Sequence, residues 1–173
     1  LGAILGNPKR AEEIIAFYKA DVSRVEKAMA GLGDGEKPSV LVVMGSMRSG
    51  KYAVRVPAQA WMQTYQVKAA GGRPVWLDAA EQSGGWTVVN LEQIAAWDPD
   101  RLIIIVWYSL DALEFKNWLV ADPQWKKIRA VAEGRVNYFP SDFYGWDTPD
   151  VRWSLGLTWM AANLHPARMK DYG

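Results

Sequence analysis

Apolar and polar residues recur along the chain in blocks that predict helices and strands in turn. A helical period predicts one helix from Asn7–Pro8 to about Met29, buried along a single stripe. Unbroken apolar runs at 39–44 and 102–106 predict strands buried on both faces, as in parallel sheets. The stripe of the first helix consists of Ile14, Tyr18, Val22, Val25 and Met29.

The rest of the chain continues the alternation. Short strands are predicted at 74–77 and 136–139, and a polar, glycine-bearing linker at 31–38. Because strands and helices alternate, we expect an α/β fold, a three-layer sandwich with a mainly parallel central sheet. The remaining helices are predicted from Pro57 to Gly71–Gly72, and at 90–97, 110–120, 125–132 and 149–164.

An aromatic-rich segment follows the last predicted strand, which stops at Pro140. Thr148 is the predicted N-cap of the closing helix, with Pro149 as its first residue. Ligands of open α/β sheets bind at such strand-to-helix loops. Tyr144 and Trp146 therefore either stack on a flat ligand or pack the loop onto the sheet. Trp107 and Tyr108 follow the second buried strand at the same edge and are further candidates for ligand contact, and Trp86 is a weaker one. The other tryptophans considered, Trp61, Trp97, Trp118 and Trp159, are expected to lie in the core.

Composition narrows the chemistry. The 173 residues suffice for one domain, and 20 basic against 19 acidic side chains give no nucleic-acid footprint. The absence of Cys excludes thiolate catalysis and Cys-based zinc sites, and His165 before Pro166 is typical of a helix end. No catalytic residue, metal or cofactor is predicted. The start of the chain, without Met or a basic region, reads as the tail of an earlier helix and predicts a fragment or trimmed chain.

Gly45 to Lys51 nearly matches the phosphate-binding pattern G-x-x-x-x-G-K-[ST]. The last position is Tyr52, which lacks the short hydroxyl side chain that holds magnesium, and the two valines of 53–56 make a poor helix start. A nucleotide-binding enzyme is therefore a minor alternative. We expect a basic, glycine-rich loop at the ligand-facing edge, with Arg48, Lys51 and Tyr52 as candidate contacts.

Arg152 is predicted in the first turn of the closing helix, where free N–H groups also favour an anion. Together with Arg48 it would suit a ferric chelate or an oxyanion such as molybdate or tungstate. Alternatively, Arg152 forms a salt bridge with Asp150 or Asp147. Tyr138 and Tyr144 also stay open as ligands of iron.

Several motifs, in their order along the chain, resemble the periplasmic binding proteins for iron complexes and cobalamin. Residues 85–104, with Leu91-Glu92-Gln93 and Asp98-Pro99-Asp100, are similar to that family's S-L-E-Q-L-L-A-x-x-P-D segment. Residues 122–125 and 130–136 are similar to its D-P-x-W and A-V-x-x-G-R-V-Y runs. Trp146, Pro149 and Arg152 resemble its aromatic loop and final helix, and 7–13 resembles the end of its inter-lobe helix, so the resemblance covers nearly the whole chain.

The resemblance implies one lobe of a two-lobed binding protein joined by a long helix. Residues 1–35 would supply the end of the inter-lobe helix region and the following helix, and 36–173 the C-terminal lobe. It implies that the protein is a solute-binding component of an ABC importer and not an enzyme. This chain and an N-terminal lobe, which is missing here, would together bind an iron complex, haem or cobalamin. The protein would then deliver the ligand to a permease/ATPase complex in the membrane. The location would be periplasmic, or extracellular as a membrane-anchored lipoprotein. Glu92 would dock onto the permease, unless it is an ordinary first-turn residue favoured by the helix dipole.

Overall fold

The computed structural model describes residues 2–48, 51–81, 84–107, 110–139 and 145–170. Its sheet has the strand order β4-β2-β1-β5-β6, and β3 pairs with the start of β1. The pairs β1·β3, β1·β5 and β5·β6 are parallel, whereas β1·β2 and β2·β4 are antiparallel. The predicted α/β class with a mainly parallel sheet is confirmed. The strands are β1 (Ser39–Arg48), β2 (Lys51–Val56), β3 (Arg73–Pro74), β4 (Thr87–Val88), β5 (Arg101–Val106) and β6 (Val136–Tyr138).

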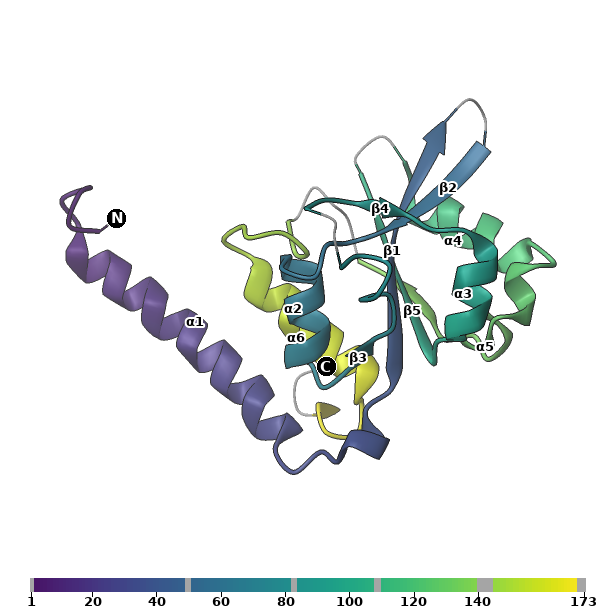
Figure 1. The fold of residues 1–173 in the computed structure, drawn as a ribbon. Helices are drawn as coiled ribbons and strands as arrows, with labels where there is room; N and C mark the ends of the chain where they lie inside the picture. Colours follow the sequence, from purple (N-terminus) through teal and green to yellow (C-terminus); the bar gives the residue numbers. More distant parts are fainter. Residues whose placement is uncertain (1, 49–50, 82–83, 108–109, 140–144, 171–173) are drawn as a thin grey trace.

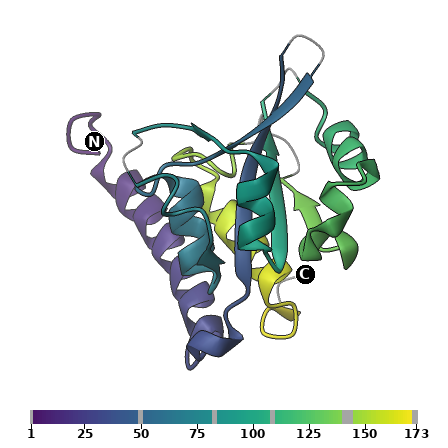
Figure 2. The same ribbon diagram turned by 45° about the vertical axis from the view of Figure 1, so that its right-hand side comes forward.

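Helices cover both sides of the sheet and make three layers (Figure 1). On one side α2 (Met62–Ala69) and α6 (Trp153–Leu164) pack together, and α1 (Pro8–Met29) lies outside α6. On the other side lie α3 (Leu91–Trp97), α4 (Ala112–Ala121) and α5 (Arg129–Ala132), which the turned view in Figure 2 separates clearly from α2. The described residues also include the short 3-10 turns η1 (Asp34–Glu36) and η2 (Trp125–Lys127).

The core follows from the two long apolar runs. Residues 40–43 of β1 and 102–104 of β5 are fully buried, because helices cover both faces of these central strands. The two strands run side by side in parallel, with Val42 opposite Ile103. The helix predicted at 90–97 begins with a capping box, in which Asn90 Oδ1 accepts from the Gln93 amide at 2.8 Å.

The expected loop from Gly45 to Lys51 is wrong. β1 continues to Arg48 and is followed by β2, which runs back along it with Met44 opposite Arg55. The reason is the alternation of 53–56, in which Val54 and Val56 are buried while Ala53 and Arg55 are more exposed. A strand therefore stands where a phosphate-binding loop would need the start of a helix.

The predicted start of the closing helix is also wrong. Thr148 and Pro149 lie in a turn, and α6 begins at Trp153 with Arg152 as its N-cap. The turn is held against α2, because the buried side-chain amide of Gln66 donates to the carbonyl oxygens of Trp146 and Trp153. These tertiary hydrogen bonds compete with an earlier helix start.

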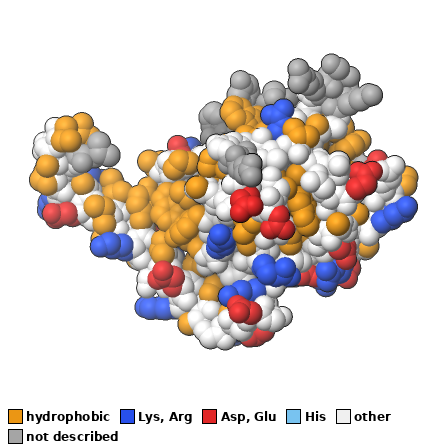
Figure 3. All heavy atoms as spheres, viewed as in Figure 1, with side chains coloured by type: hydrophobic (Ala, Val, Ile, Leu, Met, Phe, Trp, Pro, Cys, Tyr) orange, Lys and Arg blue, Asp and Glu red, His pale blue; other side chains and the backbone are white. Residues whose placement is uncertain are grey.

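The long helix α1 is anchored by its middle and C-terminal parts. The Tyr18 hydroxyl donates to the carbonyl oxygen of Val151 at 2.7 Å, and the Ser154 hydroxyl donates to the buried Asp21 carboxylate at 2.8 Å. Towards its N-terminus, apolar side chains stay exposed, among them Phe17. Figure 3 shows hydrophobic side chains gathered where α1 meets the start of α6. Among the described residues, no helix has both the length and the apolar character needed to cross a membrane.

Candidate ligand-binding site

An open cavity of about 670 Å³ lies beyond the carboxyl end of β5, between the start of α2 and the turn that precedes α6. This is the edge of a parallel sheet at which ligands of α/β folds bind. Most of its wall is apolar. Among the described residues it is lined by Ala60, Trp61, Met62, Gln63, Tyr65, Trp86, Trp107, Asp147, Thr148 and Pro149.

Aromatic rings from three separate segments form much of this wall. Trp61 is the N-cap residue of α2, and its ring meets the ring of Trp86 edge to face, with centroids 5.3 Å apart. Trp107 directly follows β5, is 51% exposed, and donates its indole N–H to the sulfur of Met44 at 2.7 Å. Rings held in this way offer a rigid, flat contact area to a ligand.

The wall includes one carboxylate and one amide, beside the hydroxyl-bearing side chains of Tyr65 and Thr148. Asp147 is only 2% exposed, and its Oδ2 accepts a hydrogen bond from Gln63 Nε2 at 3.1 Å. Desolvation raises the pKa of Asp147 above its ordinary value, although the Gln63 hydrogen bond acts in the opposite direction. No Lys or Arg is among the described residues that line the cavity.

Of the side chains predicted to bind ligand, the structure brings Trp107 and the weaker candidate Trp86 to the cavity. Trp146 is half-buried and packs against the core next to Asp147, and it is not among the described lining residues. Arg152 lies further along the same turn, and its Nε is 3.5 Å from Asp150 Oδ1. This salt bridge is the alternative to ligand binding that was considered for Arg152. Ligand contact by Trp146 and Arg152 stays a prediction.

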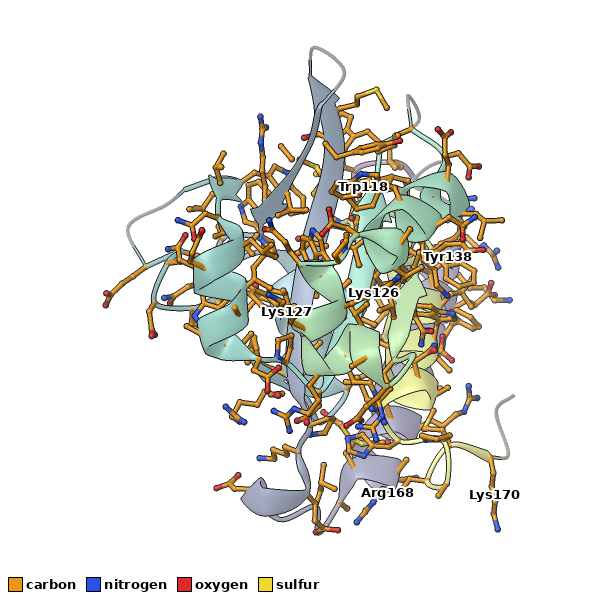
Figure 4. The ribbon with its side chains drawn as sticks, turned by 90° about the vertical axis from the view of Figure 1, so that its right-hand side faces the viewer. Trp118, Lys126, Lys127, Tyr138, Arg168 and Lys170 are labelled. Atoms are coloured by element: carbon orange, nitrogen blue, oxygen red, sulfur yellow. The ribbon has the colours of Figure 1, made fainter. Side chains whose placement is uncertain are left out.

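Tyr52 projects from β2 towards α4 instead. The centroid of its ring lies 5.2 Å from that of Phe115 and 4.4 Å from that of Trp118. Desolvation and the nearby Glu114 carboxylate raise the pKa of Tyr52. Figure 4 labels Trp118 of α4 together with Tyr138 of β6, whose ring lies 5.7 Å from the Lys116 ammonium.

Other predicted contacts lie outside the described residues or away from the cavity. Tyr108 and Tyr144 are outside the described residues, as is the side chain of Arg48, whose backbone ends β1. Glu92 is exposed in the first turn of α3, the position that both of its interpretations require.

Sequence reasoning missed several residues that make the cavity. Trp61 was expected in the core, yet it lines the wall, because α2 begins only after it and leaves its side chain at the helix start. Gln63 and Asp147 were not predicted as site residues, because their contact joins segments far apart in the chain. The one local signal was the position of Asp147 directly after Trp146 in the aromatic-rich segment.

Comparison with known proteins decides the family. The sequence profile described as periplasmic binding protein matches residues 1–143. The chain belongs to this family. A search of curated proteins found none that matches this chain.

Solved structures of this family share the fold. An ABC transporter substrate-binding protein from Listeria monocytogenes is 22% identical with a TM-score of 0.78, over 96% of this chain and 61% of its own. A periplasmic solute-binding protein from Veillonella parvula is 28% identical with a TM-score of 0.75, over 99% and 49%. The siderophore-binding protein FeuA from Bacillus subtilis is 18% identical with a TM-score of 0.71, over 93% and 55%. The chain thus corresponds to one lobe and spans about half to three-fifths of the length of these proteins.

Proposed function

We propose that this chain is the C-terminal lobe of the solute-binding component of an ABC importer. The protein would capture an iron complex, haem or a cobalamin-type ligand and deliver it to a membrane permease. The observation that carries the proposal is the aromatic cavity beyond β5, at the ligand-facing edge of a periplasmic binding protein lobe. FeuA, solved with ferri-bacillibactin, and an Fe³⁺-hydroxamate transport protein from Saccharomonospora viridis support an iron complex as the ligand. The proposal includes no catalytic step.

The exposed apolar face of α1 supports a two-lobed arrangement. Ile14 and Ile15 are 40% and 51% exposed, and Phe17 is 56% exposed, on a helix whose middle is anchored to α6. Isolated apolar residues on a surface need no explanation, but a contiguous group indicates a covered face. We therefore propose residues 1–35 as the end of the inter-lobe region and 36–173 as the lobe that closes on its partner lobe.

Delivery to the permease assigns a role to Glu92. An exposed carboxylate at the start of a helix is well placed to pair with arginine side chains of a membrane partner. Such a partner implies that the protein works outside the cytoplasm, in the periplasm or as a lipoprotein anchored to the outer face of the membrane.

An oxyanion such as molybdate is the second candidate ligand. It is favoured by the fold of the molybdate-binding protein MolA from Haemophilus influenzae, solved with molybdate. The charge of the cavity opposes it, because no basic side chain is among the described lining residues and Arg152 pairs with Asp150. A nucleotide is less well supported still, since 51–56 form a strand instead of a phosphate-binding helix.

A thermal-shift panel on the full-length protein tests the proposal. The panel contains ferric hydroxamates, ferric catecholates, haem, cobalamin, molybdate, tungstate and ATP–Mg. A ligand specific to the folded state adds about 2.7 kcal/mol of stability at a hundredfold excess over its Kd. We expect a shift with one iron chelate, haem or corrinoid. A shift with molybdate, tungstate or ATP–Mg alone would contradict the proposal in favour of the corresponding alternative.

A further inference from the structure

Two buried acceptor atoms in the wall of the cavity point to the kind of ligand that it binds. Asp147 is only 2% exposed, and one of its carboxylate oxygens, Oδ2, accepts a hydrogen bond from the side-chain amide of Gln63. The other oxygen, Oδ1, and the side-chain oxygen of Gln63 are buried without a hydrogen-bond partner among the described residues. Both side chains line the cavity.

A carboxylate oxygen that is buried and unpaired is costly, and a donor supplied by a bound molecule would remove that cost. The same burial raises the pKa of Asp147, which means that the folded lobe disfavours its negative charge. A positively charged ligand group would supply both the donor and the charge.

The surrounding side chains favour the same class of ligand. Trp61, Trp86 and Trp107 present aromatic rings, which attract cations through the negative potential of their faces. The described part of the wall contains no Lys or Arg that would pair with an anion. The wall therefore combines one carboxylate with several aromatic rings.

We propose that the cavity selects a metal complex that carries a protonated amine, and that Asp147 and Gln63 accept hydrogen bonds from its ammonium group. This inference rests on the proposed function and specifies its substrate class. It opposes anionic complexes such as ferric tris-catecholates, because their charge would approach Asp147. Gln63 acts by holding one carboxylate oxygen, which leaves the other without a protein donor until the ligand group supplies one.

The test compares two iron complexes that differ at one group, which is a charged amine in one and a neutral amide in the other. Ferrioxamine B carries a pendant ammonium group, and its N-acetyl derivative is neutral at the same position. Quenching of tryptophan fluorescence in the full-length protein gives the Kd of each complex, because three Trp residues line the cavity. The variants are Asp147→Asn, which removes the charge, and Asp78→Asn, which removes an exposed charge outside the described cavity wall.

We expect ferrioxamine B to bind at least about tenfold more tightly than the acetylated complex, equivalent to about 1.4 kcal/mol. Asp147→Asn should abolish that difference, and Asp78→Asn should preserve it. Thermal melts of both variants without ligand establish that they are folded.

Equal affinity for the two complexes, or an Asp147→Asn protein that keeps the preference, would overturn the inference. Tighter binding of ferric enterobactin, haem, cobalamin or molybdate than of ferrioxamine B would also overturn the inference. If the tighter ligand is ferric enterobactin, haem or cobalamin, the proposed function still holds. Failure of every iron complex, haem and cobalamin to bind would overturn the proposed function itself, and this inference with it.

Discussion

The side-chain amide of Gln66 donates a hydrogen bond to the carbonyl oxygen of Trp146, with a nitrogen–oxygen distance of 2.6 Å. The same nitrogen lies 3.0 Å from the carbonyl oxygen of Trp153. One buried side chain of α2 thus holds both ends of the turn that carries Asp147 and leads into α6. The shape of the cavity depends on this contact because the turn forms part of its wall.

Replacing Gln66 by Leu should destabilise the fold. The change removes the donor to the Trp146 carbonyl oxygen and one hydrogen bond to the Trp153 carbonyl oxygen, and we expect a loss of about 2–3 kcal/mol in the free energy of unfolding. Urea denaturation measures it. Gln124→Leu, at an exposed position, is the control and should change stability by less than about 0.5 kcal/mol. Equal effects of the two substitutions would show that the turn is held by other contacts.

Gly156 allows α6 to approach the same turn. A Cβ atom at this position would lie 2.0 Å from the carbonyl oxygen of Trp146 and 2.7 Å from Gln66 Nε2. Gly156→Ala should therefore cost about 1–3 kcal/mol through overpacking and should also weaken ligand binding, because the turn must move. Calorimetric melting checks the first effect and ligand titration the second. Gly35→Ala, where a Cβ meets nothing within 4 Å, is the matched control.

Asp100 should contribute stability that is lost in acid. Desolvation alone would raise its pKa, but hydrogen bonds from the Ser39 amide and hydroxyl, with the charges of Arg129 and Arg101, lower it below the ordinary value. A carboxyl group with a lowered pKa stabilises the fold above its unfolded pKa of about 4, and this contribution disappears as pH falls through the folded pKa.

Asp100→Asn should therefore be less stable than the wild type at neutral pH, and the difference should shrink below about pH 4. Urea titrations at a series of pH values measure it. A difference that stays constant across the series would mean that the charge of Asp100 is not what stabilises the native state.

Asp147 should behave in the opposite way. Because its pKa is raised, its ionisation opposes folding, and stability decreases as pH rises from about 4 through the folded pKa. We expect Asp147→Asn without ligand to be at least as stable as the wild type at neutral pH, with the advantage lost in acid. The same titrations check this. A strongly destabilised variant would assign Asp147 to the support of the turn.

Glu92 should matter for delivery and not for capture. Glu92→Ala should leave the Kd of the ligand unchanged, since the residue is exposed in α3 and does not line the cavity. Stimulation of the reconstituted permease and ATPase should fall about tenfold, equivalent to about 1.4 kcal/mol of docking energy. Glu12→Ala, at an exposed position of α1, is the control. Full stimulation by the Glu92 variant would favour the ordinary helix-start interpretation.

The local pattern of apolar and polar residues predicts those parts of the fold in which every residue of a segment is buried. The runs at 39–44 and 102–106 are apolar because both faces of β1 and β5 are covered, so their sequence alone indicates buried strands. β2 was missed because Gly45 to Lys51 resembles a phosphate-binding loop, although the alternation of Val54 and Val56 already favoured a strand. Helix α6 was predicted too early, because the hydrogen bonds that delay it come from Gln66.

The candidate site was harder to predict than the fold. Trp107 could be found because it directly follows a recognisable buried strand. The pair of Gln63 and Asp147 joins α2 to the turn before α6, and no local spacing encodes such a contact. Likewise, Trp61 and Trp86 meet only once the chain has folded. A site assembled from such distant segments becomes visible only in three dimensions.

The two ends of the sheet have a consequence for behaviour in concentrated solution. The sheet ends in β4, with two residues, and in β6, with three, whereas β1 at its centre has ten. Long unpaired edges act as templates on which other chains add strands, and natural proteins avoid this with short edge strands. Here β4 and β6 each expose too few backbone groups to hold another molecule in register, whereas β4 covers only Arg55 and Val56 of the six-residue β2. Short outer strands therefore limit edge-to-edge pairing at the two ends of the sheet, and the part of β2 beyond β4 is the edge at which another chain would add.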